Sequence, residues 1–203
     1  MKAIRLIALA ACMAATLDAS AQEQEIRLFS HRGGRMEHDE NTLSAFQASY
    51  DAGYRGFETD IRMTRDGALV ITHDSSLERT TDGTGTVEEK TEAEIRQLAT
   101  KQGNKMMFLD ELLEFLEGKE GLYVEFEMKT KPEALYPEER LHAYCDKLYD
   151  AVMAVKPADA TFVFTSGDYR GLRYLQAKHP GVDLLLITSK PCNDETIHLC
   201  KAM

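Results

Sequence analysis

The sequence is poor in cysteine and in positive charge, and it contains no tryptophan. Its 203 residues include four cysteines, and 24 Lys and Arg stand against 34 Asp and Glu. The resulting net charge of −10 argues against binding to a nucleic-acid backbone, which rewards clustered cations. No Cys-x-x-Cys or His-x-x-x-His spacing occurs, which argues against a zinc site. No apolar run reaches the roughly 18 residues that a membrane-spanning helix needs.

The rest of the composition is that of a globular protein. Hydrophobic residues make up 43% and charged residues 29% of the chain. This composition and length favour one folded domain, or two small ones, over a disordered or fibrous chain. Cys145, Cys192 and Cys200 are too few and too scattered for a disulfide framework, so we interpret them as small apolar residues.

The N-terminus has the three parts of a secretory signal peptide. Lys2 and Arg5 form a positive segment, an apolar stretch covers 6–17, and Ala19-Ser20-Ala21 is a small-residue cleavage site. This arrangement predicts that residues 1–21 are removed and that the protein is exported, to the periplasm or outside the cell.

An alternative cleavage site precedes Cys12. The segment Leu9-Ala10-Ala11-Cys12 resembles a bacterial lipoprotein box, and cleavage there would leave a lipid anchor on Cys12. The apolar segment would then be very short, so we favour the signal peptide, followed by a folded domain over 22–203. Both interpretations predict export.

Apolar runs of strand length alternate with segments of helical spacing along the rest of the chain. The predicted strands are 26–30, 56–63, 122–128, 161–165 and 182–188. The predicted helices are 43–52, 91–98, 109–116, 137–155, 169–178 and 194–202. Asn41 or Thr42 can cap the first helix, and Gly53 ends it. The alternation predicts βα units and a parallel sheet.

One connection is too short for a parallel crossover. Only Thr64-Arg65-Asp66-Gly67 separates the strand 56–63 from a further extended run, 68–73, whereas a crossover needs roughly a dozen residues or more. Asp-Gly is typical of hairpins, so the run 68–73 is predicted to fold back antiparallel. That register would return His73 to the neighbourhood of Asp60.

Acidic and basic side chains gather on these strands and at their ends. Two pairs of charged residues are spaced two apart, so each pair points to one face of its strand, and two histidines stand at strand ends. The six positions are Glu58 and Asp60, Glu127 and Lys129, and His31 and His73. Paired carboxylates suit a hard cation such as Ca²⁺ or Mg²⁺, and histidine suits proton transfer near neutral pH.

Seven short motifs occur in order between 26 and 129. They are His31-Arg32-Gly33, Glu40-Asn41-Thr42, Glu58-Thr59-Asp60, Thr64-Arg65-Asp66-Gly67, His73-Asp74, Leu77-Glu78-Arg79-Thr80-Thr81 and Glu127-Met128-Lys129. In this order and spacing the sequence resembles the glycerophosphodiester phosphodiesterase family. The resemblance is dense as far as Lys129 and looser from there to about 188.

The resemblance implies a TIM-type α/β barrel with a small hairpin and loop insertion after the second strand. It implies a divalent metal, Ca²⁺ or Mg²⁺, held by Glu58, Asp60 and Glu127. It also implies that His31 and His73 act as the general acid/base pair.

The resemblance further places Arg32 and Lys129 near the phosphate, with Glu40 and Asn41 as supporting residues. The implied reaction is hydrolysis of a small-molecule glycerophosphodiester to glycerol 3-phosphate and an alcohol. This chemistry agrees with the residue types, because a cation with Arg and Lys stabilises charge on the phosphoryl oxygens while two histidines move protons.

The chain departs from the family pattern in length and at one inward position. Only five barrel strands are predicted, whereas a TIM barrel has eight in about 250 residues. The family's aromatic-rich strand near the end has no counterpart in a chain without tryptophan. We therefore expect a C-terminally incomplete barrel over 22–203. Glu125 stands where a small polar residue is common, and we expect an ion pair for it below the site.

Other charged residues receive less specific interpretations. Arg79 could fix the Gly/Thr-rich loop over the site, or it could reach the phosphate. The Glu- and Lys-rich run Glu88–Arg96 is interpreted as a solvated helix face.

Two other functions fit parts of the pattern. A phospholipase acting on intact lipid would share the fold and the paired histidines, but no amphipathic or aromatic membrane-docking stretch stands out. A non-catalytic binding protein would fit an incomplete barrel, but the intact set of acids, bases and metal ligands argues against it. Replacing His31 by alanine separates the two classes, because turnover depends on it and binding does not.

Overall fold

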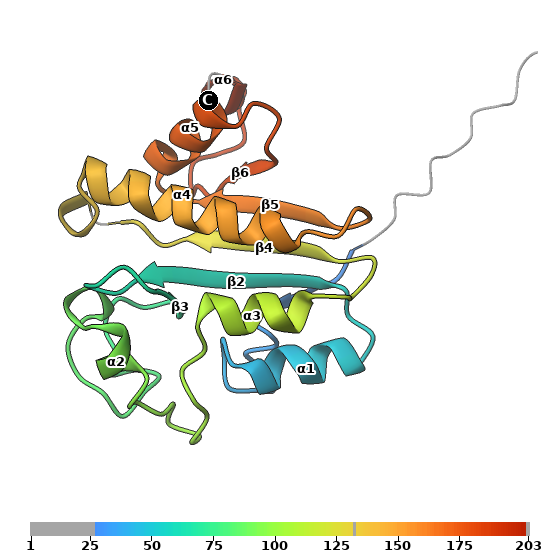
Figure 1. The fold of residues 1–203 in the computed structure, drawn as a ribbon. Helices are drawn as coiled ribbons and strands as arrows, with labels where there is room; N and C mark the ends of the chain where they lie inside the picture. The colour runs from blue at the N-terminus through green and yellow to red at the C-terminus, as the bar shows by residue number, and fades with distance from the viewer. Residues whose placement is uncertain (1–26, 132, 202–203) are drawn as a thin grey trace, which may run out of the picture.

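A computed structural model describes residues 27–131 and 133–201 (Figure 1). The predicted signal peptide and the lipoprotein box ending at Cys12 lie outside the described residues. The strands are β1 (Phe29–His31), β2 (Gly56–Met63), β3 (Leu69–Ile71), β4 (Tyr123–Met128), β5 (Thr161–Ser166) and β6 (Leu184–Leu186). The α-helices are α1 (Leu43–Asp51), α2 (Glu92–Ile95), α3 (Leu109–Leu116), α4 (Glu138–Val155), α5 (Tyr169–Lys178) and α6 (Asp194–Lys201). Two 3₁₀ turns are η1 (Val87–Glu89) and η2 (Glu133–Leu135).

Five of the strands form one parallel sheet in the order β1-β2-β4-β5-β6, and β3 pairs antiparallel with β2. Helices of the βα units pack against the sheet and against one another (Figure 1). This architecture confirms the predicted incomplete TIM-type barrel: the described residues contribute five parallel strands where a closed barrel has eight. No helix in this part of the chain is both long enough and apolar enough to cross a bilayer.

The two faces of the sheet differ in polarity because side chains alternate along each strand. Phe57, Ile61, Val124, Phe126 and Phe164 are buried in the core on the helix side. The register of β2 against β4 then places every charged residue of both strands on the opposite face, which lines the barrel interior. The fold therefore gathers acids on one surface without burying any of them among the helices.

The hairpin after β2 forms as predicted. Gly67 takes a φ of +90° in its turn, a conformation that favours glycine. The backbone N–H of Thr72 donates to the carbonyl of Asp60 over 2.9 Å, just beyond the last β3 residue. His73 consequently follows directly beside the strand that carries Asp60.

The hairpin strand β3 and the residues from it to α3 form an insertion at the C-terminal end of β2. It has a small core of its own: Ala68, Val70, Leu77, Val87, Ile95, Met106 and Phe108. The predicted helix 91–98 is shorter than expected. Thr91 and Glu94 form a capping box that begins α2, but after Ile95 the backbone continues with three-residue turns, such as Leu98 N–H to the Ile95 carbonyl at 3.0 Å.

The interpretation of Glu88–Arg96 as a solvated face is wrong where the run begins. Glu88 is only 7% exposed. It lies in η1, which contacts β2, and a buried arginine of β2 is its partner. A run of charges in the sequence does not reveal such a partner because it is 26 residues away.

Candidate active site

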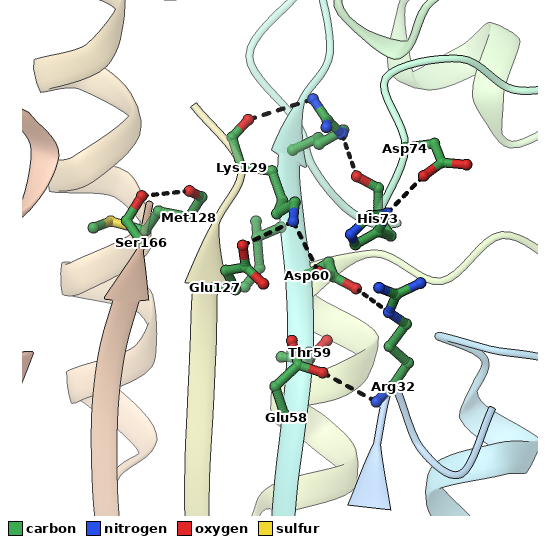
Figure 2. A network of polar contacts seen from close by, with 12 residues as sticks. Arg32, Glu58, Thr59, Asp60, His73, Asp74, Glu127, Met128, Lys129 and Ser166 are labelled. Atoms are coloured by element: carbon green, nitrogen blue, oxygen red, sulfur yellow. Dashed lines mark hydrogen bonds and ion pairs between the residues drawn. The ribbon is translucent and has the colours of Figure 1, made fainter. Parts of the chain in front are cut away.

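Three carboxylates meet on the inner face of the sheet (Figure 2). Glu58 and Asp60 come from β2, and Glu127 comes from β4, where it pairs in register with Asp60. Each offers one ligand oxygen, and these oxygens all lie within 4.8 Å of one another. Asp60 is fully buried, and the side chains of Glu58 and Glu127 are largely buried. Side-chain alternation and strand register thus bring together the three predicted metal ligands.

Arg32 follows β1 and faces two of these acids. Its Nε lies 3.2 Å from Asp60 Oδ2, and its backbone N–H donates to Glu58 Oε2 over 3.1 Å. Its Nη1 donates to Glu40 Oε1 over 3.1 Å. Arg32 has a φ of +54°, a left-handed conformation that turns the chain sharply after β1. The strain is offset by these contacts, which hold the guanidinium against the carboxylates.

Lys129 and Asn41 complete the polar surroundings. Lys129 Nζ lies 2.7 Å from Glu127 Oε1 and 3.5 Å from Asp60 Oδ1. Asn41 Nδ2 donates to Asp60 Oδ2 over 2.9 Å, and its backbone N–H donates to the Arg32 carbonyl over 2.8 Å. Of the two predicted cap residues, Thr42 caps α1, which leaves the Asn41 side chain for Asp60.

The acids outnumber the cations in this cluster. Burial, together with the charges of Asp60 and Glu127, raises the pKa of Glu58 to about 8. Glu58 Oε1 and Asp60 Oδ1 are buried without a hydrogen-bond partner among the described residues. Buried oxygens of this kind are costly unless a ligand satisfies them, and hard carboxylate oxygens are the donors that Ca²⁺ and Mg²⁺ prefer. The donor set therefore fits a divalent cation.

The two predicted catalytic histidines lie at the end of β1 and just beyond β3, two strands that pair with the same edge of β2. His31 ends β1 with its side chain 51% exposed, and its Nε2 lies 3.6 Å from Glu58 Oε2. Burial and the neighbouring charge of Arg32 lower the pKa of His31. His73 follows β3, and its Nδ1 lies 2.6 Å from Asp74 Oδ1 (Figure 2).

Asp74 is a site residue that sequence reasoning did not assign. Burial acts to raise its pKa, but hydrogen bonds from Arg79 and His73 lower the pKa to about 2. Asp74 is therefore ionised at neutral pH and holds the His73 ring through Nδ1, which leaves Nε2 for proton transfer. The adjacent His73-Asp74 motif was the available signal.

Arg79 joins two parts of the site, Glu40 with its partner Arg32 and Asp74 with its partner His73. Its guanidinium donates to Glu40 Oε1 over 2.7 Å and Oε2 over 3.0 Å, and its Nε donates to Asp74 Oδ2. Glu40 in turn holds Arg32, so Arg79 links the residues beside both histidines. Of the two predicted alternatives for Arg79, these contacts favour fixing the loop over the site.

The ion pair expected for Glu125 does not occur in the described part of the chain. Glu125 lies on the inner face of β4, two residues before Glu127. It pairs in register with Glu58 of β2. Burial and the charge of Glu127 raise the pKa of Glu125. The reason is positional: the cations of the site all lie at the C-terminal ends of the strands, beyond the reach of Glu125.

The fold and the site together define an α/β-barrel protein with a carboxylate, histidine and cation cluster at the C-terminal ends of its strands. A profile of the glycerophosphoryl diester phosphodiesterase family matches residues 31–201. The chain belongs to this family.

Individual relatives agree with the family match. A glycerophosphodiester phosphodiesterase of Caldanaerobacter subterraneus is 36% identical over 123 residues, which cover 56% of this chain and 50% of that protein. An Oleispira antarctica phosphodiesterase, solved in complex with the product sn-glycerol-3-phosphate, superposes with a TM-score of 0.74 at 25% identity, covering 86% of this chain and 72% of that one. A glycerophosphodiester phosphodiesterase of Agrobacterium tumefaciens gives 0.64 at 27% identity, covering 79% and 66%. The matches to the first curated relatives span half of their length or less.

Proposed function

We propose that this chain catalyses the metal-dependent hydrolysis of glycerophosphodiesters to glycerol 3-phosphate and an alcohol. The observation that carries the proposal is the meeting of three carboxylates, two cations and two histidines at the C-terminal ends of β1, β2 and β4. Active sites of α/β barrels lie at this end of the strands. The relative whose structure holds sn-glycerol-3-phosphate supports the substrate class.

Glu58, Asp60 and Glu127 would hold the divalent cation, Ca²⁺ or Mg²⁺. When bound, the cation supplies positive charge to the phosphoryl oxygens. Their fit to a cation is supported by two buried oxygens that have no hydrogen-bond partner in the described part of the chain. It is also supported by the burial and the neighbouring negative charges that raise the pKa of Glu58.

Arg32 and Lys129 would bind the phosphate and stabilise the charge that grows on its oxygens in the transition state. Both side chains are largely buried, so their charge is only weakly screened by solvent. Contacts to Glu40 and Asp60 fix Arg32 before the substrate arrives, which avoids reorganisation during the reaction.

The histidines would divide the proton transfers between them. The lowered pKa of His31 suits it to accept a proton from the attacking hydroxyl or water. Asp74, ionised and bonded to Nδ1, holds His73 so that it can give a proton to the departing alkoxide oxygen. The attacking group can be a water or a hydroxyl of the substrate's own glycerol.

Export is part of the proposal. A signal peptide at residues 1–21 would direct the protein to the periplasm or outside the cell, and the alternative is a lipid anchor on Cys12. N-terminal sequencing with mass spectrometry of the processed protein tests this. A first residue of Gln22 supports the signal peptide, and an acylated Cys12 supports the anchor.

The reaction is tested by measuring release of glycerol 3-phosphate from glycerophosphocholine with EDTA, Ca²⁺ and Mg²⁺ compared side by side. Release that depends on one of the cations is the expected result. His31→Ala should lower turnover by about 10²–10⁴-fold. His142→Ala serves as the matched control, because His142 of α4 stacks on Tyr174 of α5 away from the site. Metal-independent release, or turnover unchanged by His31→Ala, would contradict the proposed mechanism. Hydrolysis of intact phospholipid alone would favour the phospholipase alternative.

A further inference from the structure

Arg62 is a buried arginine of β2 that the proposed chemistry does not use. It lies two residues beyond Asp60 on the same face of the strand, and its side chain is 7% exposed. A buried guanidinium is costly unless each donor finds a partner. The partners of its guanidinium therefore indicate why an arginine is buried at this position.

The guanidinium of Arg62 reaches the backbone of both strand ends that flank β2. Its Nε donates to the His73 carbonyl over 2.9 Å, and its Nη1 donates to the Lys129 carbonyl over 3.4 Å (Figure 2 shows both residues). His73 is the proposed proton donor and Lys129 the proposed phosphate ligand. One side chain therefore touches the main chain of two site residues that are 56 positions apart in the sequence.

These contacts begin where the sheet hydrogen bonds end. On one side the last ladder bond runs from Thr72 N–H to the Asp60 carbonyl, at 2.9 Å. On the other it runs from Lys129 N–H to the Ile61 carbonyl, at 3.1 Å. Beyond these points neither chain is held by the sheet, and Arg62 provides the next attachment for both.

Glu88 of the insertion holds Arg62 in this position. Its Oε1 accepts from Arg62 Nη1 over 2.7 Å and from the Tyr136 hydroxyl over 3.2 Å, and its Oε2 accepts from the Ser75 hydroxyl over 2.6 Å. The Tyr136 hydroxyl also accepts from the Met63 N–H over 3.0 Å. Both carboxylate oxygens of Glu88 therefore accept hydrogen bonds.

We infer that the Arg62–Glu88 pair is a positioning element for the reaction, coupling the packing of the insertion to the placement of His73 and Lys129. The inference rests on the proposed function. Arg62 and Glu88 touch neither the three metal ligands nor the reacting atoms, so they act through the backbone of the residues that do. Displacing a catalytic group by about 1 Å can cost roughly 10²-fold in rate.

The test separates positioning from stability with a double variant. Arg62→Met alone leaves Glu88 buried without its cation and should lower the melting temperature. The double variant Arg62→Met/Glu88→Leu removes both charges, so the melting temperature should return toward that of the wild type. Its kcat for glycerophosphocholine should stay about 10–100-fold below wild type, with KM changed far less. Recovery of both stability and kcat would overturn the inference.

Two further variants sharpen this result. Arg140 on α4 donates to the Met63 and Thr64 carbonyls, so Arg140→Met removes an arginine from the end of β2 without touching His73 or Lys129. It should keep kcat within about threefold of wild type. Arg62→Lys keeps the charge opposite Glu88 but loses the planar fork, so it should stay folded and still lose kcat. A fully active Arg62→Lys protein would also overturn the inference.

A readout without turnover distinguishes this inference from the proposed function. In metal-free protein labelled with ¹⁵N-histidine, the ring signals of His73 should shift in Arg62→Met/Glu88→Leu, and those of His142 should not. If the wild type fails to release glycerol 3-phosphate, the proposed function fails, and these signals still decide the positioning. Unshifted His73 signals would overturn it whatever the activity.

Discussion

Two groups of buried acids lie at the same end of β2, and they are partnered in opposite ways. Among the described residues, Glu58 and Asp60 keep two buried oxygens without hydrogen-bond partners, and burial together with the charges of Asp60 and Glu127 raises the pKa of Glu58 to about 8. Glu88 has an arginine, a tyrosine and a serine on its two oxygens. The first group is costly to the folded chain, whereas the second holds the chain together.

The difference shows how a binding centre and a structural ion pair can be told apart by their partners. Buried charges that are fully paired need nothing further, and removing one partner is destabilising. Buried acids that outnumber their cations persist where a ligand supplies the missing positive charge. By this criterion the three carboxylates are a candidate cation site and Glu88 is not.

The largest effect on catalysis is expected from a substitution among the three carboxylates. Glu58→Gln keeps the shape of the side chain but removes a ligand charge, and transition-state stabilisation worth several kcal/mol, on the order of 10³-fold in kcat/KM, should be lost. The same variant should raise the melting temperature of the EDTA-treated protein, because the repulsion is gone. Glu125→Gln is the control, because Glu125 of β4 is a nearby acid on the same face of the sheet. Turnover preserved in Glu58→Gln would refute its assignment as a ligand.

A substitution at Glu88 should lower the stability of the folded protein, whereas Glu58→Gln should raise it in EDTA. Glu88→Gln leaves the buried Arg62 without a counter-charge and should cost about 3–5 kcal/mol of folding free energy. In a protein of this size that corresponds to a melting temperature lower by roughly 10 °C. Glu89→Gln, the exposed neighbour, should leave it unchanged. Equal melting temperatures for the two variants would show that Glu88 is not a structural partner.

The pH dependence of stability sharpens the comparison. The folded-state pKa of Glu58, about 8, lies above its ordinary value of 4.5. Between these values the unfolded chain has released the proton and the folded chain retains it, so stability falls as pH rises. Melting temperatures in EDTA should therefore decline from pH 5 to pH 8, and added Mg²⁺ or Ca²⁺ should raise them most at pH 8. Glu58→Gln should flatten this decline, and an equally steep decline in that variant would assign it to other groups.

The smallest effect is expected at Arg79, whose side chain is 47% exposed. Its ion pairs with Glu40 and Asp74 are partly screened, so Arg79→Met should change the folding free energy by less than about 1 kcal/mol. Turnover should nevertheless fall about 10-fold, because the link between the two halves of the site is lost. Arg65→Met removes a similarly exposed arginine that pairs with Glu94 away from the site. Identical turnover in both variants would show that Arg79 does not position the residues of the site.

Local patterns in the sequence were sufficient for most of the fold. The strand 56–63 and the helices 109–116 and 169–178 were predicted with the bounds that the structure shows. These segments have strong periodicity. In the structure Asp168 caps α5. The edge strand was predicted as 182–188 and extends only over Leu184–Leu186, because it pairs with three residues of β5 and has no strand on its other side in the described residues.

Partners that are distant in the sequence were not predictable in the same way. The interpretation of Glu88 as a solvated charge is wrong. The ion pair expected for Glu125 does not occur among the described residues. Each depended on which side chain arrives from another element. Arg62 comes to Glu88 from 26 residues away and Tyr136 from 48. No local pattern carries that information.

The sequence by itself determined most of the secondary structure, the hairpin at Asp66-Gly67 and the face on which Glu58, Asp60 and Glu127 project. Those features follow from alternation along a strand and from turn chemistry, both of which act over a few residues. The tertiary structure decided which charges meet. Parallel register set Asp60 beside Glu127, and packing of the insertion set Glu88 against Arg62. The physical reason is that a buried charge is paired by the side chains that the fold packs around it, and these come from distant parts of the sequence.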